Sequence, residues 1–406
     1  MIVLSADYLY RNGAFEEAQA VAFDTHIKDI GDPVTLMERY PDATLLRAPA
    51  HSVIYPGFIN PHVHLEFSSN KTSLHYGEFI PWLFSVIEHR DELIAACDDD
   101  TMQREITQML KSGITTFGAV SSFGADLNVC RTASQRVVYF NELIGSQAHT
   151  ADVLYGDFLQ RLELSKEAAD SRFIPAVAIH APYSVHPILL QRAVALAKSE
   201  TMPLSTHFLE SPAEREWLEK QTGPFADFFR RFFNTTTPVT DIESFMHAFD
   251  GYPALFVHGV QCTSKELTHL ADQGHTLIHC PRSNRYLGCG KLTLDTLRTS
   301  RLSWGLATDG LSSNDSLSML DEMRAALMLH HDMPLQQLAY DLIEAATSVP
   351  AKALGIDAGE LLPGKWADIT VLSLPELPLR KEEIALWSIL YAKEAAMVFI
   401  EGERYV

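Results

Sequence analysis

The strongest constraint on the fold is an alternation that runs through the middle of the chain. Short apolar or β-branched runs recur there, each followed by a polar or glycine-containing turn and then by a stretch with helical periodicity. Eight such units over roughly 300 residues predict a parallel (β/α)8 barrel. The predicted strands are 52–59, 113–120, 136–143, 173–179, 204–206, 255–257, 276–278 and 302–307, with helices between them such as 187–200 and 317–330.

A doubly wound open sheet is the alternative fold. It normally carries a glycine-rich phosphate-binding turn after an early strand, and the chain has neither a G-x-G-x-x-G nor a Walker sequence. In a barrel, the chemistry lies where the strands end and the following loops begin. Polar residues at the carboxyl ends of the predicted strands are therefore the candidates for a functional site.

The two ends of the chain differ from the middle. Residues 1–56 and 361–406 consist of short strand-like pieces broken by turns, such as Gly31-Asp32-Pro33 and Pro363-Gly364-Lys365. We therefore expect a small β-sandwich assembled from residues 1–56 and 361–406, and a barrel over residues 57–360.

Charge and cysteine content narrow the function classes. The chain has 32 Lys and Arg against 52 Asp and Glu, a net charge of −20 that disfavours nucleic acid and anionic membranes as partners. Its five cysteines are odd in number and lack a C-x-x-C motif, which indicates reduced thiols. The first residues lack the pattern of a signal peptide, and no apolar run approaches the about 18 residues of a membrane-spanning helix. We expect a cytoplasmic protein.

Histidine is abundant, with 17 residues, and several lie at predicted strand ends. His62 and His64 come at the end of the first strand, where residues i and i+2 of an extended segment point to the same side. His207 ends the fifth strand and Asp309 follows the eighth. Three nitrogens and one oxygen suit a divalent ion, Zn²⁺ or Fe²⁺. Such an ion pulls the pKa of bound water toward neutrality.

Two further strand ends carry candidate catalytic groups. Glu210 lies three residues after His207, where a carboxylate could shuttle protons, and His258 ends the sixth strand. Each candidate also has a plainer interpretation that the sequence leaves open: loop histidines at His62 and His64, a helix N-terminal carboxylate at Glu210, a core histidine at His258 and an Asx turn at Asp309. Four separate strand ends that each supply a metal-competent group favour the functional interpretation.

Together these motifs resemble the amidohydrolase superfamily. The resemblance is carried by the stretch P-G-F-I-N-P-H-V-H at 56–64, His207-x-x-Glu210, the strand end at His258, Pro281-x-Ser283-Asn284, Thr308-Asp309-Gly310 and the closing P-G-K-W-A-D at 363–368. It implies a metal-bearing barrel with a β-sandwich built from both termini. The predicted strand 173–179 contains no Lys of the kind that bridges two metals in binuclear members, so the resemblance is to the mononuclear deaminase branch.

This branch implies hydrolytic deamination of the adenine ring of a nucleoside. The roles implied by the resemblance are metal binding by His62, His64, His207 and Asp309, proton transfer from water by Asp309, protonation of ring nitrogen N1 by Glu210, and orientation or polarisation of the attacking hydroxide by His258. The stretch 180–184, H-A-P-Y-S, resembles that of deaminases acting on S-adenosylhomocysteine-like nucleosides, in which the His contacts substrate.

More narrowly, the segment 62–77 is similar to the 6-aminodeoxyfutalosine deaminases of the futalosine route to menaquinone. Deamination of S-adenosylhomocysteine or methylthioadenosine, another heterocycle amidohydrolase or chlorohydrolase reaction and, more distantly, a non-catalytic barrel remain as alternatives. We expect a nucleoside as the small-molecule partner and a homodimer as the assembly, with no nucleic acid or membrane partner.

The candidate substrate-binding residues are His180, Glu66, Trp82 and Arg282. Trp82 and Arg282 are included because the benzoate-like arm of 6-aminodeoxyfutalosine calls for an aromatic wall and a cation. Trp82 also fits the apolar face of a core helix, Arg282 also fits a helix-capping role, and Glu66 also fits a loop cap.

Overall fold

Eight parallel strands form the centre of the computed structural model, which describes residues 1–406. Their order in the sheet is the same as their order in the sequence. They are β8 (Phe58–Val63), β9 (Ile114–Ser121), β10 (Arg136–Leu143), β11 (Phe173–Ile179), β12 (Leu204–Phe208), β13 (Leu255–His258), β14 (Thr276–His279) and β15 (Ser303–Leu306). The residues after β15 return to β8: the backbone N–H of Asp309 donates to the carbonyl of His62 (3.2 Å) and that of Thr308 to the side chain of Asn60 (3.1 Å). The expected (β/α)8 barrel is confirmed.

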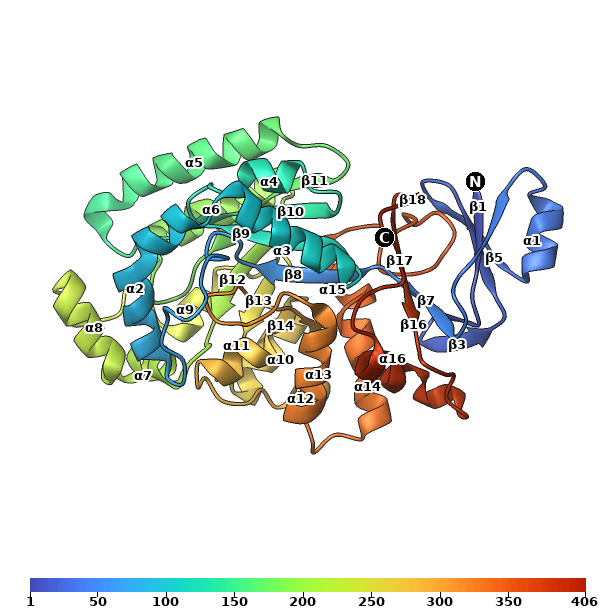
Figure 1. Ribbon diagram of the computed structural model, residues 1–406. Helices are drawn as coiled ribbons and strands as arrows, with labels where there is room; N and C mark the ends of the chain where they lie inside the picture. The colour runs from blue at the N-terminus through green and yellow to red at the C-terminus, as the bar shows by residue number, and fades with distance from the viewer.

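Helices surround these strands (Figure 1). They are α2 (Phe79–Ala96), α3 (Asp99–Lys111), α4 (Leu127–Arg131), α5 (Ala151–Glu167) with the preceding 3-10 turn η1 (Ala148–Thr150), α6 (Pro187–Glu200), α7 (Pro212–Lys220), α8 (Pro224–Phe233), α9 (Ile242–His247), α10 (Ser264–Asp272), α11 (Pro281–Tyr286), α12 (Leu294–Ser300), α13 (Met319–Leu329), α14 (Leu335–Ala345) and α15 (Ser348–Leu354). Their starts follow local sequence: Ser211 caps α7 ahead of Pro212, and Thr263 and Glu266 form a capping box at α10.

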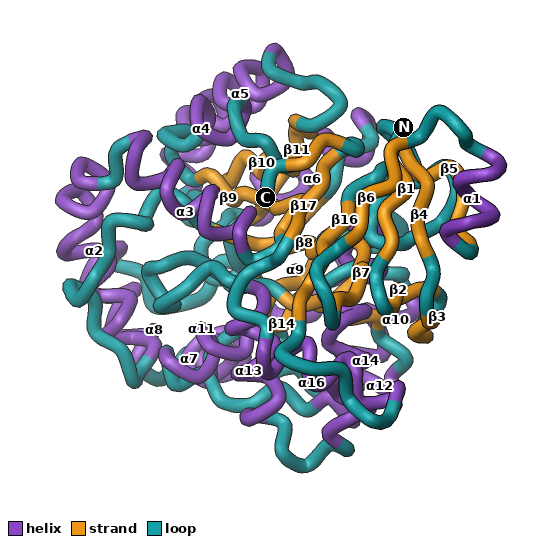
Figure 2. Tube along the Cα trace, turned by 45° about the vertical axis from the view of Figure 1, so that its right-hand side comes forward, coloured by secondary structure: helices purple, strands orange, loops and turns teal.

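The two ends of the chain form two smaller sheets, one from N-terminal strands alone and one from strands of both ends. Their strands are β1 (Ile2–Ser5), β2 (Tyr8–Arg11), β3 (Ala14–Glu17), β4 (Ala20–Phe23), β5 (Ile27–Gly31), β6 (Thr44–Arg47), β7 (Ser52–Pro56), β16 (Ile369–Ser373), β17 (Met397–Ile400) and β18 (Glu403–Arg404). The orders are β5-β4-β1-β6 and β18-β17-β16-β7-β2-β3, so β7 and β16 join the two termini as an antiparallel pair (Figure 2). The β-sheets expected from both termini are present, whereas the division at residues 56 and 360 stays a prediction.

The expected strand 52–59 is two strands that belong to different sheets. The chain leaves the terminal sheet after β7 and enters the barrel at β8, and Gly57 is the only residue between them. Its backbone N–H donates to the carbonyl of Asp368 (2.9 Å), and a Cβ at Gly57 would lie 2.1 Å from Oγ1 of Thr115. A continuous apolar run concealed this change of sheet, because both strands are buried throughout.

The termini also contain helices that the turn-rich sequence did not predict. They are α1 (Pro33–Arg39), capped by Asp32, the 3-10 turn η2 (Lys381–Glu383) and α16 (Ile384–Tyr391), which packs against α14. The α16 sequence I-A-L-W-S-I-L-Y is apolar on every face, so periodicity cannot distinguish it from a buried strand. No helix in residues 1–406 combines the length and the apolar character needed to cross a membrane.

Candidate metal centre and active site

The four predicted metal ligands come from three strand ends and converge. His62 is part of β8, His64 follows it directly, His207 is part of β12 and Asp309 follows β15. Nε2 of His64 lies 3.3 Å from Nε2 of His207, and the Nε2 atoms of His62 and His64 each lie 3.7 Å from Oδ1 of Asp309. Nitrogen atoms of the three histidines lie within 4.8 Å of one another. The structure thus brings together every residue of the predicted set.

The hydrogen bonding of these residues fits a divalent ion. Both ring nitrogens of His62 are buried and have no hydrogen-bond partner, an arrangement that costs free energy unless another group takes up a lone pair. Burial lowers the pKa of His64 to about 4, which leaves its imidazole neutral and able to coordinate. Nδ1 of His207 lies 2.8 Å from the carbonyl oxygen of His180, so its Nε2 faces the other ligands. Three imidazoles and a carboxylate are an appropriate donor set for Zn²⁺ or Fe²⁺.

Asp309 is held from several sides. Its Oδ2 accepts hydrogen bonds from the hydroxyl groups of Ser283 and Ser313, both at 2.7 Å. Its backbone is left-handed (φ 60°), as is that of His258 (φ 71°). Non-glycine residues in this region cost about 1–3 kcal/mol each and are concentrated at functional sites. The chain therefore turns sharply at these two strand ends, where both side chains reach the centre.

Glu210 and His258 lie beside the four ligands. Oε2 of Glu210 is 3.8 Å from Nε2 of His258. Burial raises the pKa of the Glu210 carboxyl well above its usual range, and the carboxylates of Asp309 and Glu214 raise it further. Glu214 accepts the backbone N–H groups of Leu209 and Glu210 at 3.1 and 2.8 Å, and so fixes the loop that carries Glu210. A carboxyl group in this setting can hold a proton near neutral pH and donate it to a substrate.

A cavity of about 1050 Å³ lies over this centre. Its base includes His64, His207, Glu210, His258 and Asp309. The rest of its lining is rich in aromatic side chains, which are Phe79, Trp82, Tyr183, Phe228, Phe229 and Phe232, and contains three arginines, Arg90, Arg161 and Arg231. The space exceeds what a purine ring needs, so a substrate with an additional large group can be accommodated.

Two of the four substrate-binding candidates line this cavity. His180 does so with its Nδ1 2.6 Å from Oγ of Ser184, and Trp82 does so while its indole N–H donates to the carbonyl of Ser312 (2.8 Å). Both side chains are thus fixed in orientation before a ligand binds.

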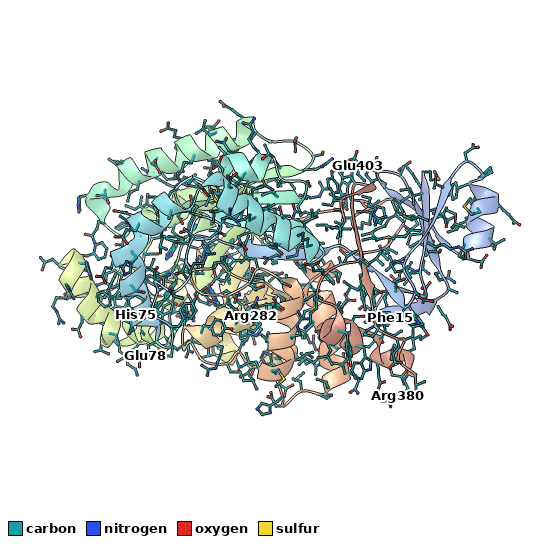
Figure 3. The ribbon with its side chains drawn as sticks, viewed as in Figure 1. Phe15, His75, Glu78, Arg282, Arg380 and Glu403 are labelled. Carbon is teal, nitrogen blue, oxygen red and sulfur yellow. The ribbon has the colours of Figure 1, made fainter.

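The other two candidates do not line the cavity. Arg282, on α11 among the helices on one side of the barrel (Figure 3), donates from Nε to Glu322 (2.6 Å) and from Nη1 to Asp315 (2.9 Å). Glu66 accepts the backbone N–H groups of Ser122, Phe123 and Ala125, and so caps the loop after β9. Partners that only the tertiary structure supplies satisfy both buried charges, and substrate contact by Arg282 or Glu66 stays a prediction.

Among the cavity-lining residues that the sequence analysis did not identify, Glu142 and Arg231 bear most directly on the chemistry. Glu142, the penultimate residue of β10, is 1 % exposed, accepts the Ser122 hydroxyl at 2.5 Å and lies 3.8 Å from Nδ1 of His207. A carboxylate within an apolar strand was a usable signal for it. Arg231 belongs to the F-F-R-R-F-F sequence of α8, whose clustered aromatics were a second such signal.

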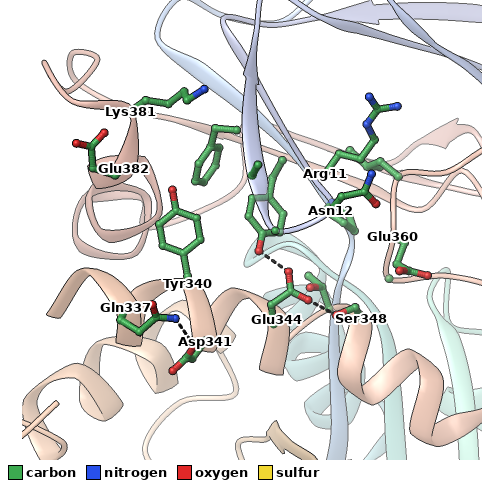
Figure 4. A pocket seen from close by; sticks show the side chains of 18 residues that line it. Arg11, Asn12, Gln337, Tyr340, Asp341, Glu344, Ser348, Glu360, Lys381 and Glu382 are labelled. Carbon is green, nitrogen blue, oxygen red and sulfur yellow. Dashed lines mark hydrogen bonds between the residues drawn. The ribbon is translucent and has the colours of Figure 1, made fainter. Parts of the chain in front are cut away.

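Two other polar features lie away from this centre. One is a hollow between the β2–β3 hairpin and α14, where Tyr10 and Ser348 both donate hydrogen bonds to Glu344 (Figure 4). The other is a partly exposed cluster of His247, Asp250 and His269, in which the Asp carboxylate lies 2.7 and 2.8 Å from the two imidazoles. Neither combines a deep apolar cavity with converging unpaired ligands.

Comparison with known proteins agrees with this geometry. Residues 53–404 match the amidohydrolase family. An aminodeoxyfutalosine deaminase from Nitratiruptor sp. is 45% identical over 388 residues, which cover 96% of this chain and 95% of the relative. An adenosine deaminase from Helicobacter pylori is 37% identical over 397 residues (96% and 95%), and a 5-methylthioadenosine/S-adenosylhomocysteine deaminase from Syntrophomonas wolfei is 30% identical over 376 residues (87% and 81%).

Solved structures give the same result. The Helicobacter pylori aminofutalosine deaminase in complex with methylthio-coformycin is similar with a TM-score of 0.95 and 36% identity, over 100% of both chains. An adenosine deaminase from Xanthomonas campestris with bound zinc has a TM-score of 0.79 at 22% identity, over 99% of this chain and 92% of the other, and so shares the fold.

Proposed function

Because this chain belongs to the amidohydrolase family and is a hydrolytic deaminase, we propose that it converts 6-aminodeoxyfutalosine and water to deoxyfutalosine and ammonia. The observation that carries this substrate assignment is the 45% identity to an aminodeoxyfutalosine deaminase over 96% of the chain. The assignment places the reaction in menaquinone biosynthesis.

We propose that His62, His64, His207 and Asp309 hold one divalent ion, Zn²⁺ or Fe²⁺. The support is their convergence and the unpartnered nitrogens of His62. The ion supplies a Lewis acid that brings the pKa of water near neutrality.

The side chains around this centre can perform the proton transfers. A proton held by Glu210 passes to N1 of the adenine ring, which prevents negative charge from accumulating on the ring while C6 becomes tetrahedral. Asp309 accepts a proton from the water molecule. Nε2 of His258 lies beside Glu210, where it can accept the O–H of the attacking water and orient it. Transfer of the proton taken up by Asp309 to the exocyclic amine lets ammonia leave.

The remainder of the substrate fits the outer cavity. Trp82, Phe228 and Phe232 offer aromatic surface to the benzoate-like arm. The Arg231 guanidinium is 5.3 Å from the Phe232 ring, lines the cavity and makes no salt bridge within the chain. Arg231 is therefore the cation that we assign to the substrate carboxylate, in place of Arg282.

We also propose that the protein is cytoplasmic. All five cysteines are free, four of them buried, which agrees with a protein of the reducing cytoplasm. We retain a homodimer as the proposed assembly, which sedimentation velocity tests.

Steady-state kinetics on four nucleosides test the proposal. We expect the highest kcat/KM for 6-aminodeoxyfutalosine among 6-aminodeoxyfutalosine, S-adenosylhomocysteine, methylthioadenosine and adenosine, measured as ammonia release by enzyme loaded with a single metal. If another of the four is the best substrate, the narrow assignment fails and adenine deamination stands. If none releases ammonia, the proposed reaction is wrong.

A further inference from the structure

A chain of four buried side chains leads away from the active site. Nδ1 of His258 lies 2.9 Å from Oδ1 of Asn284, and Nδ2 of Asn284 lies 3.3 Å from Nδ1 of His279. Nε2 of His279 lies 3.0 Å from Nε2 of His330. His258 and His279 end neighbouring strands, Asn284 is in α11, and His330 directly follows α13. All four residues are at most 1 % exposed.

The side-chain amide of Asn284 determines which groups donate and which accept along this series of hydrogen bonds. An amide oxygen only accepts hydrogen bonds and an amide NH₂ only donates them, while a neutral imidazole has one donor and one acceptor nitrogen. With Oδ1 toward His258, the proton of His258 is on Nδ1. With Nδ2 toward His279, Nδ1 of that ring accepts, so its Nε2–H donates to Nε2 of His330. Each tautomer in the chain therefore determines the next.

The reverse assignment of donors and acceptors would also satisfy every hydrogen bond among these four side chains. If His330 donated from Nε2, His279 would accept there and donate from Nδ1, the Asn284 amide would turn over, and His258 would carry its proton on Nε2. The tautomer of His330, the side chain of this series farthest from the active site, is therefore coupled to the tautomer of His258. Burial lowers the pKa of His330 to about 4, and nearby Lys291 lowers it whereas Asp332 raises it, so the ring is neutral. The orientation of Asn284, with Oδ1 toward His258 and Nδ2 toward His279, makes Nε2 of His330 the accepting nitrogen.

We propose that His279 and His330 are positioning residues that, through Asn284, keep the proton of His258 on Nδ1 and present an unprotonated Nε2 to the reaction centre. This rests on the proposed function, because Nε2 of His258 lies 3.8 Å from the Glu210 carboxylate and faces the cavity where the water and ring C6 meet. An accepting nitrogen there orients the O–H of the attacking water. A donating one would instead hydrogen bond to Glu210 and compete for its oxygen.

The test compares His330→Met with His330→Gln in enzyme loaded with zinc. Met removes the acceptor at the end of the chain, whereas the Gln side-chain oxygen can accept from His279. The matched control is His331→Met at the adjacent exposed histidine. The direct readout is the ¹⁵N NMR tautomer signature of His258, assigned with a His258→Gln variant and measured without substrate.

We expect His330→Met to convert His258 from a single Nδ1–H tautomer to a mixture. Its kcat should fall about 10-fold or more while KM and metal content stay within about twofold, the scale typical of partners that orient active-site ligands. His330→Gln should restore both the tautomer and most of kcat, and His331→Met should change neither.

Two results would overturn the proposal. One is a His258 tautomer that is the same in His330→Met and the unchanged protein, whatever happens to kcat, since a merely structural role would produce that result. The other is equal loss of kcat in the Met and Gln variants. If His330→Met does not fold, His279→Gln supplies the same comparison closer to His258. Because the NMR readout needs no turnover, a failure of the substrate assignment leaves this test intact.

Discussion

Nε2 of His64 and Nε2 of His207 lie 3.3 Å apart, although 143 residues separate them in the chain. Without an ion, one of these nitrogens must carry a proton for the contact to be favourable. With an ion, both lone pairs point toward the same centre. Burial lowers the pKa of each ring, so the first arrangement is disfavoured and the second is the one that the fold prepares.

Metal content should depend on this pair. We expect His64→Ala to reduce bound divalent metal, measured by elemental analysis after dialysis, from about one ion per chain to near zero. Thermal unfolding of the unchanged protein should shift downward on chelation, because an ion at 100 times its Kd stabilises the folded state by about 2.7 kcal/mol. In His64→Ala that shift should vanish. Equal metal loss in His247→Ala would assign the ion to the surface cluster instead.

Glu210→Gln should abolish turnover and leave the metal in place. The amide is nearly isosteric but cannot deliver a proton to N1, so we expect kcat to fall by about 10² to 10⁴. Substrate binding, measured as the Kd of a non-hydrolysed nucleoside, should change little. Loss of metal from this variant would show that Glu210 is a ligand and not a proton donor.

Arg231 and Arg230 form a matched pair for the carboxylate of the substrate. Arg231 lines the cavity, whereas Arg230 forms a salt bridge with Asp227 and does not. We expect Arg231→Gln to raise KM for 6-aminodeoxyfutalosine roughly 10-fold, since a hydrogen bond to a charged group contributes about 1.5–3 kcal/mol. KM for adenosine, which has no carboxylate, should stay unchanged, and Arg230→Gln should affect neither. A rise for both substrates in Arg231→Gln would contradict this assignment.

The sequence was most informative where one rule of geometry applied repeatedly. Parallel strands of a barrel end on one face, so His62, His64, His207 and Asp309 could be expected to meet without knowledge of any loop. It was least informative for long charged side chains. The sequence places Arg282 beside a strand end. Its guanidinium pairs with Glu322 and does not line the cavity, which depends on a residue 40 positions away in the sequence.

The terminal segments show a second limit. A run of buried residues from Ser52 to Val63 has the same pattern whether it forms one strand or two. The break at Gly57 is decided by contact with Thr115 and Asp368, which lie on other elements. Local pattern therefore predicted that strands exist here, and tertiary contacts decided to which sheet each belongs.

Gly310 should be intolerant of a side chain for a functional reason. A Cβ at this position would lie 2.8 Å from both the Cβ and the carbonyl oxygen of His64. Gly310→Ala must therefore displace His64 or the adjacent Asp309, and we expect metal affinity to fall about 10-fold or more. Overpacking should also cost about 1–3 kcal/mol in urea unfolding of the metal-free protein. Gly156→Ala is the comparison for stability alone, since its Cβ would meet nothing within 4 Å and its backbone is not left-handed. Unchanged metal affinity in Gly310→Ala would contradict the argument.

Stability at acid pH should depend on His275, which lies far from the metal ligands in sequence. Its ring is 2 % exposed, Nδ1 accepts the backbone N–H of Ala254 at 3.2 Å, and Nε2 has no partner. Burial lowers the pKa of His275 to about 4; nearby Asp250 opposes the shift and His269 adds to it. In the unfolded chain the pKa returns to about 6.5. Between these two values the unfolded state binds a proton that the folded state does not.

The free energy of unfolding should therefore fall as pH drops from about 6.5 toward 4, and this residue alone should contribute roughly 2 kcal/mol of loss by pH 5. The variant His275→Gln removes the titration, because its side-chain oxygen can still accept from Ala254 and carries no ionisable group. Urea unfolding at about pH 7.5 and pH 5 measures the effect in both proteins. We expect the variant to lose less stability than the unchanged protein over this interval, whatever its stability at neutral pH. The same loss in both would mean that His275 is protonated in the folded state, and that its burial does not oppose the charge.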